Sequence, residues 1–420
     1  MQIGNYFKNI NFRHKKHFFS GLSFKSSNCK KNSIFFAIKG NNSDGSKFIK
    51  DAIKKGARTI ISNSKFQGIK NQVLFIKSNK PRELLSKLSS KIYSDKPKNL
   101  VAVTGTNGKS SIADFYTQIL RLNKIKVASI GTLGIKTDSY NLKTENTTLD
   151  PISLNQQLQK FKKLNINNVI LEASSHGLKQ NRLDGLKFKT GIFTNLSHDH
   201  LDYHKSYKDY FESKLILFKK LLKKNASIIT DSDISQYKKI KSIANKKNYR
   251  ICTIGKLDND LKIIDHHYRD DKQILKIKRK KKIYKIELNL IGKIQVKNIL
   301  MAMLAAEKNN ISFDKIVRAI SKIKNVSGRL EKIGILKNNS KVILDYAHTP
   351  EALFCSLQNL KEQFKNKKIV VVFGCGGNRD KSKRPKMGKI ANYFCSKIYL
   401  TDDNPRYENP KKIRSEIKKK

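Results

Sequence analysis

The sequence predicts an α/β protein with a central parallel sheet covered by helices, and three observations support this fold class. From residue 99 onward apolar runs alternate with helical patterns, with strands expected at 101–103, 126–130 and 168–172. A glycine-containing turn joins the first of these strands to a helix, and a further strand–helix unit begins near residue 326. Such alternation is typical of strand–helix–strand units, whose strands lie parallel in one sheet.

The chain divides into three expected domains, residues 1–96, 97–325 and 326–420, and no internal repeat is evident. In the outer two domains the expected elements are strands at 33–38, 59–61, 341–344, 369–373 and 398–400 and a short helix at 52–55. In the central domain, 295–307 is expected to be a helix with Ile299, Met303 and Leu304 on one face. Residues 248–291 are interpreted as a peripheral, β-rich addition.

The net charge of +55 and the pI near 10.1 would ordinarily suggest nucleic-acid binding. The lysines are spread over every segment, however, and they accompany abundant isoleucine and asparagine. A compositional bias therefore explains the charge more simply than a dedicated binding surface. The densest internal run, 278–282, is interpreted as a solvated hairpin or loop. We expect weak, salt-dependent attraction to polyanions and no specific nucleic-acid partner.

Neither a membrane segment nor a disulfide framework is indicated. The sequence has no run of about eighteen apolar residues, and its N-terminus lacks a signal-peptide pattern. The five cysteines are Cys29, Cys252, Cys355, Cys375 and Cys395, which are scattered and form no C-x-x-C pair. A reducing, cytoplasmic location is therefore expected.

The strongest functional motif begins where the first central strand ends. Gly105 and Gly108 allow backbone N–H groups to converge on phosphate oxygens at the positive end of the following helix. Lys109 can reach the outer phosphates, and the Ser110 hydroxyl can hold Mg²⁺. The general G-x-x-x-x-G-K-[ST] pattern is met only in its second half, because its first glycine would fall on Val103. A glycine-rich turn before an ordinary helix is the alternative interpretation.

Acidic and histidine-rich segments follow two of the expected strands. Glu172 ends the strand 168–172, at the sheet edge where ligands of α/β proteins bind, and is a candidate Mg²⁺ ligand. Three histidines and two aspartates lie within 198–204, and His200 is interpreted as a further Mg²⁺ ligand. The alternatives are a strand-end surface glutamate, and either a zinc site or a solvated turn for the histidine cluster.

Lys214 occupies an otherwise apolar helical stripe, which runs through Tyr207, Phe211, Phe218 and Leu221. Burial lowers the pKa of a lysine and leaves a neutral amine. Such an amine near Mg²⁺ can take up CO₂ and become a carbamate, which binds metal as a carboxylate does. The alternative is a lysine whose stem packs in the stripe while its ammonium group reaches water.

Six segments in order resemble the Mur ligase family: 105–110, 172–178, 195–204, 345–350, 375–381 and 403–406. The resemblance covers essentially the whole chain. It implies a three-domain α/β fold in which a central P-loop parallel sheet is followed by a Rossmann-like C-terminal domain. The last two segments are similar to those of members that add diaminopimelate to a peptidoglycan precursor.

The resemblance implies roles for individual residues, which fall into several sites. The ATP-binding residues are Gly105, Thr106, Asn107, Gly108, Lys109, Ser110, Ser111, Asn298, Arg329 and Asp345. The metal ligands are Ser110, Glu172, His200 and a carbamylated Lys214, and the catalytic residues are Lys109, Glu172, His200 and Lys214. The UDP-substrate residues are Ser26, Asn41, Asn42, Ser43, Asn146, Thr147, Thr148, Ser174, Gln180 and Arg182. The diaminopimelate residues are Arg379, Asp403, Asn404, Pro405 and Arg406, of which Arg406 would clamp the distal carboxylate.

The implied reaction is the ATP-dependent addition of meso-diaminopimelate to UDP-N-acetylmuramoyl-L-alanyl-D-glutamate through an acyl phosphate, with Mg²⁺ as cofactor. The expected partners are these three substrates, without membrane insertion, and the expected state is a monomer. A related ligase, folylpolyglutamate synthetase, is one alternative; a nucleic-acid-dependent P-loop ATPase and an inactive fragment are others.

Three departures from the family pattern bear on these expectations. Lys25-Ser26-Ser27 stands where the family has Asp-Ser-Arg, and Ile294-Gln295 stands where it has Phe-Asn. The family's Gly-Lys-Gly-His-Glu motif is absent, and residues 326–420 are few for a complete doubly wound domain. The sequence is therefore expected to have an incomplete, truncated C-terminal domain.

Overall fold

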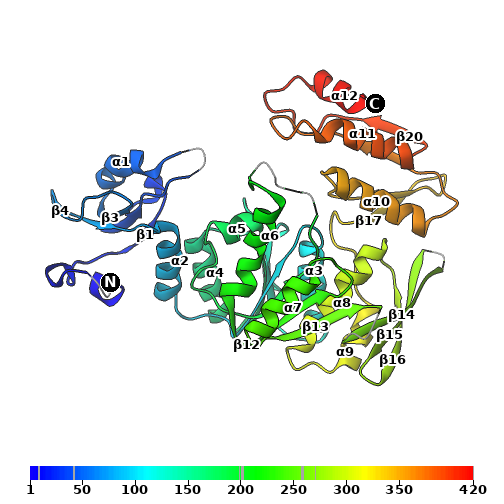
Figure 1. The fold of residues 1–420 in the computed structure, drawn as a ribbon, viewed down its shortest axis with the longest axis horizontal. Helices are drawn as coiled ribbons and strands as arrows, with labels where there is room; N and C mark the ends of the chain where they lie inside the picture. The colour runs from blue at the N-terminus through cyan, green and yellow to red at the C-terminus, as the bar shows by residue number, and fades with distance from the viewer. Residues whose placement is uncertain are drawn as a thin grey trace.

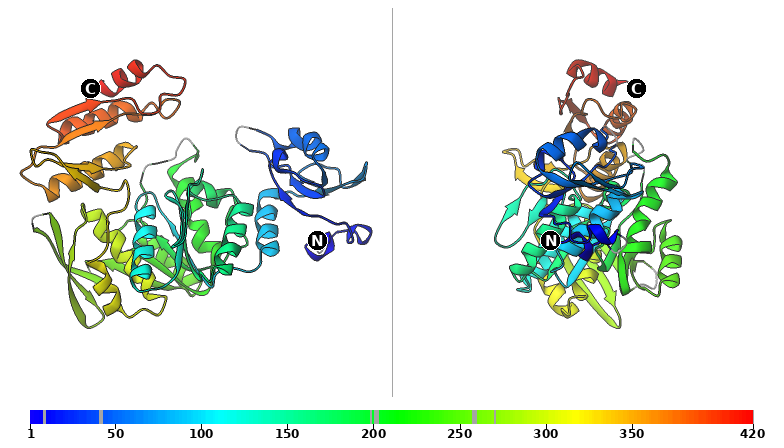
Figure 2. Two further views of the ribbon diagram at one scale, coloured as in Figure 1. Left: turned by 180° about the vertical axis from the view of Figure 1, so that it is seen from behind. Right: turned by 90° about the vertical axis from the view of Figure 1, so that its left-hand side faces the viewer.

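The computed structural model describes residues 1–7, 10–40, 43–197, 199, 203–256, 260–269 and 271–419. The chain forms an N-terminal unit with a five-stranded sheet, a central unit with an eleven-stranded sheet, and a C-terminal unit with two two-stranded sheets. Figure 1 and the left view of Figure 2 show the N-terminal and C-terminal units on opposite sides of the central unit. The central sheet therefore lies between the two outer units.

The N-terminal sheet has the strand order β1-β2-β3-β5-β4, in which β4 alone runs antiparallel. Its strands are β1 (Gly21–Ser23), β2 (Ser33–Phe36), β3 (Ala57–Ser62), β4 (Gly68–Lys70) and β5 (Val73–Lys77). Every residue of β2 is buried, because Ile34 and Phe36 face one apolar cluster while Phe35 faces another. Helix α1 (Ile49–Lys54) covers one face, and α2 (Pro81–Ile92) leads into the central unit.

The central sheet has the order β16-β15-β14-β13-β12-β11-β6-β10-β7-β8-β9. The strands from β14 to β7 are parallel, and the pairs at both margins are antiparallel. The parallel strands are β6 (Asn99–Thr104), β7 (Val127–Gly131), β10 (Asn168–Glu172), β11 (Phe188–Phe193), β12 (Leu222–Asp231), β13 (Arg250–Gly255) and β14 (Leu261–Arg269). The marginal strands are β8 (Gly134–Lys136), β9 (Asn141–Leu142), β15 (Lys272–Arg279) and β16 (Lys282–Leu288). The predicted central parallel sheet is confirmed.

Helices cover both faces of this sheet, as the near-continuous apolar runs of its central strands require. One apolar cluster joins the sheet to α3 (Lys109–Leu122), α8 (Lys293–Glu307) and α9 (Phe313–Ile320). The other joins it to α4 (Pro151–Lys163), α6 (Tyr207–Ile216) and α7 (Tyr237–Lys246). The expected helix at 295–307 is confirmed as α8. It is buried on more than the one expected face, since Val296, Leu300 and Ala302 are buried too.

The interpretation of residues 248–291 as a peripheral, β-rich addition is confirmed in part: the segment forms four strands, and β15 and β16 lie at one margin of the sheet, but β13 belongs to its parallel part. Strand β13 pairs with β12 in parallel and is buried, so this segment extends the central sheet. The expected turn in 278–282 is confirmed as the β15–β16 hairpin, but Arg279 is only 6% exposed. Its guanidinium forms ion pairs with Asp260 at 3.2 Å and Glu307 at 2.8 Å, so it ties the hairpin to α8.

The C-terminal unit begins with the antiparallel pair β17 (Glu331–Ile335) and β18 (Lys341–Leu344). Helix α10 (Pro350–Gln363) follows, and then the parallel pair β19 (Val370–Phe373) and β20 (Lys397–Leu400), joined through α11 (Lys383–Phe394). Helix α12 (Pro410–Lys418) packs on α11 through an apolar cluster that includes Met387, Ile413 and Ile417. Within the described ranges, no helix is both long and apolar enough to cross a membrane.

We predict that Leu300→Ala lowers the free energy of unfolding by about 3 kcal/mol, because it removes a fully buried side chain from a close-packed face of α8. Leu122→Ala is the matched control, since Leu122 ends α3 and is 41% exposed; it should change stability by less than about 0.5 kcal/mol. Urea denaturation followed by circular dichroism measures both values. Equal effects of the two substitutions would contradict the described packing of α8.

Candidate active site

The phosphate-loop motif lies between β6 and α3, as the sequence predicts. Strand β6 ends at Thr104, and α3 begins at Lys109. The turn between them has positive φ angles of 144° at Gly105 and 89° at Gly108. Because side chains other than glycine rarely adopt such angles, the two glycines give the loop a backbone course that few other residues could follow.

Tertiary contacts make these glycines necessary for a second reason. A Cβ atom at position 105 would lie 1.9 Å from Thr194 Oγ1, and one at position 108 would lie 2.4 Å from Asn298 Oδ1. Neither distance leaves room for a side chain. The loop is therefore pressed between the end of β11 and the first turns of α8.

The segment after β11 holds the loop through hydrogen bonds. The backbone N–H of Asn107 donates to Asn195 Oδ1 at 2.9 Å, and Thr194 Oγ1 donates to the Asn107 carbonyl at 2.6 Å. The backbone N–H of Ser197 donates to Thr106 Oγ1 at 2.9 Å. These bonds place residues 194–197, which include the described start of the predicted 195–204 segment, against the predicted phosphate loop.

The Lys109 ammonium group lies over its own loop, where it donates to the carbonyls of Gly105 at 3.0 Å and Thr106 at 2.7 Å. Burial lowers its pKa, and the nearby Glu172 carboxylate opposes that shift. Both acceptors are neutral carbonyls, and a charged phosphate oxygen is a stronger acceptor for an ammonium group. Lys109 can therefore exchange these bonds for bonds to a phosphate.

Glu172 ends β10 beside the loop, and its side chain is 2% exposed. Its Oε2 accepts hydrogen bonds from Ser110 Oγ at 3.0 Å and Thr132 Oγ1 at 3.1 Å, and its Oε1 accepts one from the Thr132 N–H at 2.9 Å. A Cβ atom at Gly131 would lie 2.1 Å from this carboxylate. The interpretation of Glu172 as a strand-end surface residue is therefore wrong.

Lys214 is 1% exposed, so the alternative of a snorkelling side chain is also wrong. Its Nζ donates to the Gly105 carbonyl at 2.8 Å and lies 4.3 Å from the centroid of the Tyr210 ring. Burial lowers its pKa well below the ordinary value, and the charge of Lys109 lowers it further. This amine lies against the backbone of the phosphate loop.

Three predicted nucleotide residues come from α8 and the C-terminal unit. Asn298 lies against Gly108, and Arg329 Nη2 donates to Ser110 Oγ at 3.4 Å. The Asp345 carboxylate accepts bonds from the Leu330 and Ala347 N–H groups at 2.8 and 2.9 Å. The Arg329 guanidinium lies 4.7 Å from the centroid of the Tyr346 ring. Segments more than 200 residues apart in sequence thus meet at one place, as the bond between residues 110 and 329 shows.

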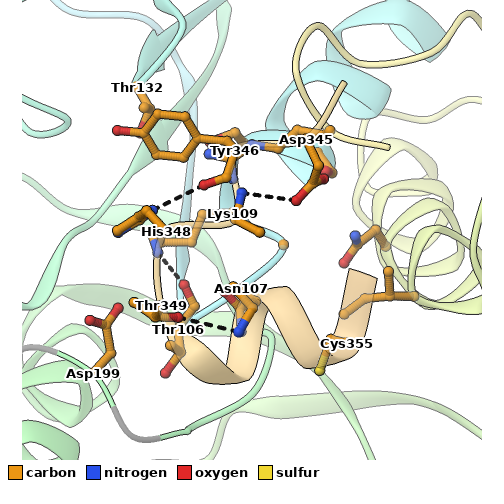
Figure 3. Close-up of a pocket in the computed structure, with 18 of the residues that line it drawn as sticks. Thr106, Asn107, Lys109, Thr132, Asp199, Asp345, Tyr346, His348, Thr349 and Cys355 are labelled. Atoms are coloured by element: carbon orange, nitrogen blue, oxygen red, sulfur yellow. Dashed lines mark hydrogen bonds between the residues drawn. The ribbon is translucent and has the colours of Figure 1, made fainter. Parts of the chain in front are cut away.

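One cavity of about 250 Å³ brings these groups together. Its lining includes the predicted residues Thr106, Asn107, Gly108, Lys109, Ser110, Ser111, Thr147, Glu172, Ser174, Lys214, Asn298, Arg329 and Asp345. Figure 3 shows its side chains from both units, with Lys109 of the central unit and Asp345, Tyr346 and His348 of the C-terminal unit around the same space.

Several lining residues were not predicted from the sequence, among them Thr132, Asp199, Tyr346, His348, Thr349 and Cys355. Thr132 was detectable in principle, because it directly follows β7 at the sheet edge that carries Glu172. Asp199, Tyr346, His348 and Thr349 lie within 195–204 and 345–350, two of the segments that carry the family resemblance, although no role was assigned to these four residues. Cys355 lies on α10, where no local pattern distinguishes a lining side chain from a solvated one.

The predicted UDP-substrate residues separate into two places. Thr148 Oγ1 donates to the Glu172 carbonyl at 2.8 Å and pairs with Ser174 Oγ at 3.0 Å; Arg182 Nη1 donates to the Thr148 carbonyl at 2.6 Å. Gln180 Oε1 accepts from Arg182 Nη2 at 2.8 Å. These residues form one network at the edge of the 250 Å³ cavity, which Ser174 also lines.

Asn146 lies instead in a second cavity, of about 860 Å³, lined by residues of the N-terminal and central units. Lys25 also lines it, whereas the predicted Ser26 is not among its lining residues. Ser43 is exposed and its carbonyl accepts from the Gly40 N–H. Asn41, Asn42 and the predicted metal ligand His200 lie outside the described residues, as do His198 and Asp202 of the zinc alternative.

The predicted diaminopimelate residues lie in the C-terminal unit, on the loops that follow β19 and β20. Arg406 Nη1 donates to the Gly377 carbonyl at 2.8 Å, and the Gly377 N–H donates to the Asn404 carbonyl at 2.9 Å. Arg379, Asp403 and Arg406 are exposed. The structure therefore brings the two loops together, but these residues do not line the 250 Å³ cavity.

Comparisons with known proteins agree with this arrangement. Residues 103–306 match the Mur ligase middle domain, 328–420 the Mur ligase glutamate ligase domain, and 19–93 the Mur ligase family catalytic domain. The UDP-N-acetylmuramoyl-L-alanyl-D-glutamate–2,6-diaminopimelate ligase of Rickettsia rickettsii is 39% identical over 408 residues, which cover 96% of this chain and 84% of the relative. The ligase of the same name from Chelativorans sp. is 38% identical over 398 residues, 95% of this chain and 82% of the relative.

A solved structure of a protein with the same name is similar in fold as well. It superposes with a TM-score of 0.77 at 29% sequence identity, covering 100% of this chain and 85% of that one. The three domain matches follow one another along the chain in the order of its three sheet-bearing units. The chain therefore belongs to the Mur ligase family.

Proposed function

We propose that this chain is the ATP-dependent ligase that joins meso-diaminopimelate to the D-glutamate carboxyl of UDP-N-acetylmuramoyl-L-alanyl-D-glutamate in peptidoglycan synthesis. The observation that carries the proposal is the single cavity that holds the phosphate loop, Glu172, Lys214 and the Arg329–Asp345 segment. The names of the curated relatives supply the substrates. A nucleotide in this cavity would contact both the central and the C-terminal unit.

Mg²⁺ fits the donors that line this cavity. The Glu172 carboxylate is buried, its three bonds come from hydroxyl and amide groups, and no ion pair neutralises it among the described residues. Carboxylate and hydroxyl oxygens are the ligands that Mg²⁺ prefers. Ser110, Glu172 and His200 would hold the ion, which when bound supplies charge neutralisation for the phosphates.

Lys214 fits the proposed carbamate for two reasons. Its buried amine has a lowered pKa, and the neutral form of an amine is the one that adds to CO₂. The product, a carbamate anion, would offset the nearby positive charge of Lys109. It would also place a further oxygen ligand behind the phosphate loop.

The reaction follows from the charges around the cavity. Lys109 and Arg329 would bind the γ-phosphate of ATP while the loop N–H groups hold the β-phosphate. The D-glutamate carboxylate attacks the γ-phosphorus, the bond to ADP breaks, and an acyl phosphate forms. The amine of diaminopimelate then attacks the acyl carbon, loses a proton and releases inorganic phosphate. The rate acceleration would come from holding the three substrates in line and from excluding water.

The remaining assignments are also proposals. Ser26, 41–43, Asn146, Thr147 and the Thr148–Ser174–Gln180–Arg182 network would bind the UDP-linked dipeptide. Arg379 and 403–406 would bind diaminopimelate once the C-terminal unit closes toward the cavity. Residues 1–96, 97–325 and 326–420 would be the domains that contribute these sites. All five cysteines are unpaired, which suits a reducing cytoplasm, and we propose that the protein acts as a monomer.

The direct test is an assay of amide formation with purified protein, ATP, Mg²⁺ and the UDP-linked dipeptide, in which each candidate amino acid is supplied in turn. ADP release and formation of the UDP-linked tripeptide should both require diaminopimelate. ATP turnover that is indifferent to the amino acid, or amide formation with glutamate on folate instead, would overturn the proposal.

We predict that Lys109→Ala lowers turnover by about 10³-fold or more, because it removes a cation that offsets charge on the transferred phosphoryl group. Lys163→Ala, at the exposed end of α4, is the matched control and should retain full activity. Steady-state ADP release measures both. Undiminished turnover of Lys109→Ala would remove the loop from the mechanism.

We predict that Lys214→Ala is nearly inactive and is partly restored by acetate, which can occupy the place of the lost carbamate. Lys109→Ala should show no such recovery, because its missing group is a cation. Incubation with ¹³C-bicarbonate should label the wild-type protein at Lys214, as read by mass spectrometry after trapping. Absence of both label and recovery at every acetate concentration would eliminate the carbamate.

We predict that Arg406→Lys raises the KM for diaminopimelate about tenfold or more while the KM for ATP stays within about twofold, since lysine cannot form the bidentate bond to a carboxylate. Arg414→Lys, in an exposed pair with Asp402 of the same unit, is the control. An unchanged KM for diaminopimelate would show that Arg406 does not bind it.

A further inference from the structure

A buried arginine in the C-terminal unit has no part in the sites described so far. Arg384, near the start of α11, is 0% exposed. Its Nη1 donates to Glu408 Oε2 at 2.9 Å and Glu416 Oε2 at 2.6 Å, and its Nη2 donates to Glu408 Oε1 at 3.1 Å and the Gly376 carbonyl at 3.3 Å. One guanidinium thus joins α11, α12 and the loops after β19 and β20.

All three side chains of this cluster carry charge at neutral pH. The Arg384 guanidinium lowers the pKa of Glu408 to about 2 and also lowers the pKa of Glu416, while the two carboxylates raise the pKa of Arg384. A buried ion cluster of this kind adds little stability over an apolar replacement of similar volume. What it does provide is a defined geometry for the segments that it joins.

Glu408 extends that geometry to the loops that carry the proposed diaminopimelate residues. Its Oε1 accepts the Asn378 N–H at 2.5 Å, and Asn378 Oδ1 accepts the Tyr407 N–H at 3.2 Å. The Gly377 N–H donates to the Asn404 carbonyl at 2.9 Å. The segments 376–378 and 404–408 are therefore joined at successive positions, with Arg406 between the joined residues.

The backbone at this place needs such support. Arg406 has a left-handed φ angle of 51°, which is unfavourable for a residue other than glycine or asparagine. Asn378, opposite it, has a φ of 52°, which asparagine tolerates. A Cβ atom at Gly377 would lie 1.8 Å from the Pro405 carbonyl oxygen, so the two loops touch backbone to backbone. The Glu408 bonds to Asn378 and Arg384 therefore add to the bonds that hold Arg406 in this conformation.

The cluster also determines which charges surround Arg406. Glu408 lies two residues beyond Arg406 in sequence, but both of its oxygens are engaged by Arg384. Lys381 Nζ also lies 3.6 Å from Glu408 Oε2. In the described part of the chain, the Arg406 guanidinium forms no ion pair and donates only to the carbonyls of Gly377 and Asn404. Its charge therefore remains available for the carboxylate of a ligand.

We propose that Arg384 and Glu408 are positioning residues for the amino-acid pocket: Glu408 holds the Arg406 loop in its strained form, and Arg384 keeps the Glu408 carboxylate from pairing with Arg406. Neither side chain touches the substrate. The inference rests on the proposed binding of diaminopimelate by Arg406 and names the residues that make that binding possible.

The test compares Glu408→Gln with Glu416→Gln in the full chain. Both substitutions remove a carboxylate from Arg384, but among the described residues Glu416 is bonded to neither loop. Glu408→Gln should raise the KM for diaminopimelate about tenfold, with the KM values for ATP and the UDP-linked dipeptide within about twofold of wild type. Glu416→Gln should leave all three within about twofold, and melting temperatures should fall similarly in both variants.

A second comparison separates charge competition from simple loss of structure. In Arg384→Met the Glu408 carboxylate keeps only the exposed Lys381 as an ion-pair partner and can turn to Arg406. The KM for diaminopimelate should therefore rise more than in the double variant Arg384→Met/Glu408→Gln. A purely structural role would make the double variant at least as impaired as the single one. That result, or equal KM values for Glu408→Gln and Glu416→Gln, would overturn the inference.

The Arg406→Lys measurement distinguishes failure of this inference from failure of the proposed function. If Arg406→Lys raises the KM for diaminopimelate and Glu408→Gln does not, only the positioning role is wrong. If neither substitution changes that KM, the amino-acid pocket itself has been misplaced. Should Arg384→Met fail to fold, the two glutamine variants still decide the question, because each removes only a charge.

Discussion

The close packing of the phosphate loop between β11 and α8 is the constraint on which the rest of the structure depends. With only hydrogen atoms at Gly105 and Gly108, Thr194 and Asn298 can approach to distances that no side chain would permit. The same approach brings Asn195 onto the backbone of Asn107 and aligns α8 with α3. The sheet order, in which β6 lies between β11 and β10, permits that approach. The cavity is a consequence of the packing.

The two lysines at the cavity, Lys109 and Lys214, are affected by charges of both signs. The charge of Lys109 lowers the pKa of Lys214, Asp199 acts against that effect, and Glu172 favours the charged form of Lys109. Burial strengthens all of these interactions because little water remains to screen them. The two arginines of the C-terminal unit differ in their partners. Arg384 is paired with two glutamates, whereas Arg406 donates to a carbonyl oxygen and its charge is not offset by an ion pair among the described residues. The proposed phosphate site and the proposed carboxylate site thus differ in how their cations are paired.

Much of the central unit could be predicted because its signals are local. The bounds of β10 agree with the prediction, the glycine turn joins a strand to a helix as expected, and Lys214 is buried as its position in an apolar stripe implied. The segment after α7 is β-rich and partly marginal as predicted, but its first strand, β13, was not recognised as part of the central sheet. Short strands alone do not show whether they extend a sheet or lie apart from it. Arg279 was missed as a buried residue for a similar reason: its carboxylate partners, Asp260 and Glu307, are distant in sequence. The roles of the site residues remain predictions.

The sequence by itself determined the fold class, the phosphate loop and the family, because glycine spacing, apolar periodicity and ordered motifs act over short stretches of chain. Only the tertiary structure decided which of these motifs share a cavity and which side chains lose contact with water. It placed Glu172 against Ser110, set Arg329 beside the same hydroxyl, and buried Arg384 among two glutamates. The physical reason is that burial and charge pairing depend on residues brought together by the sheet order, and no local pattern records that order.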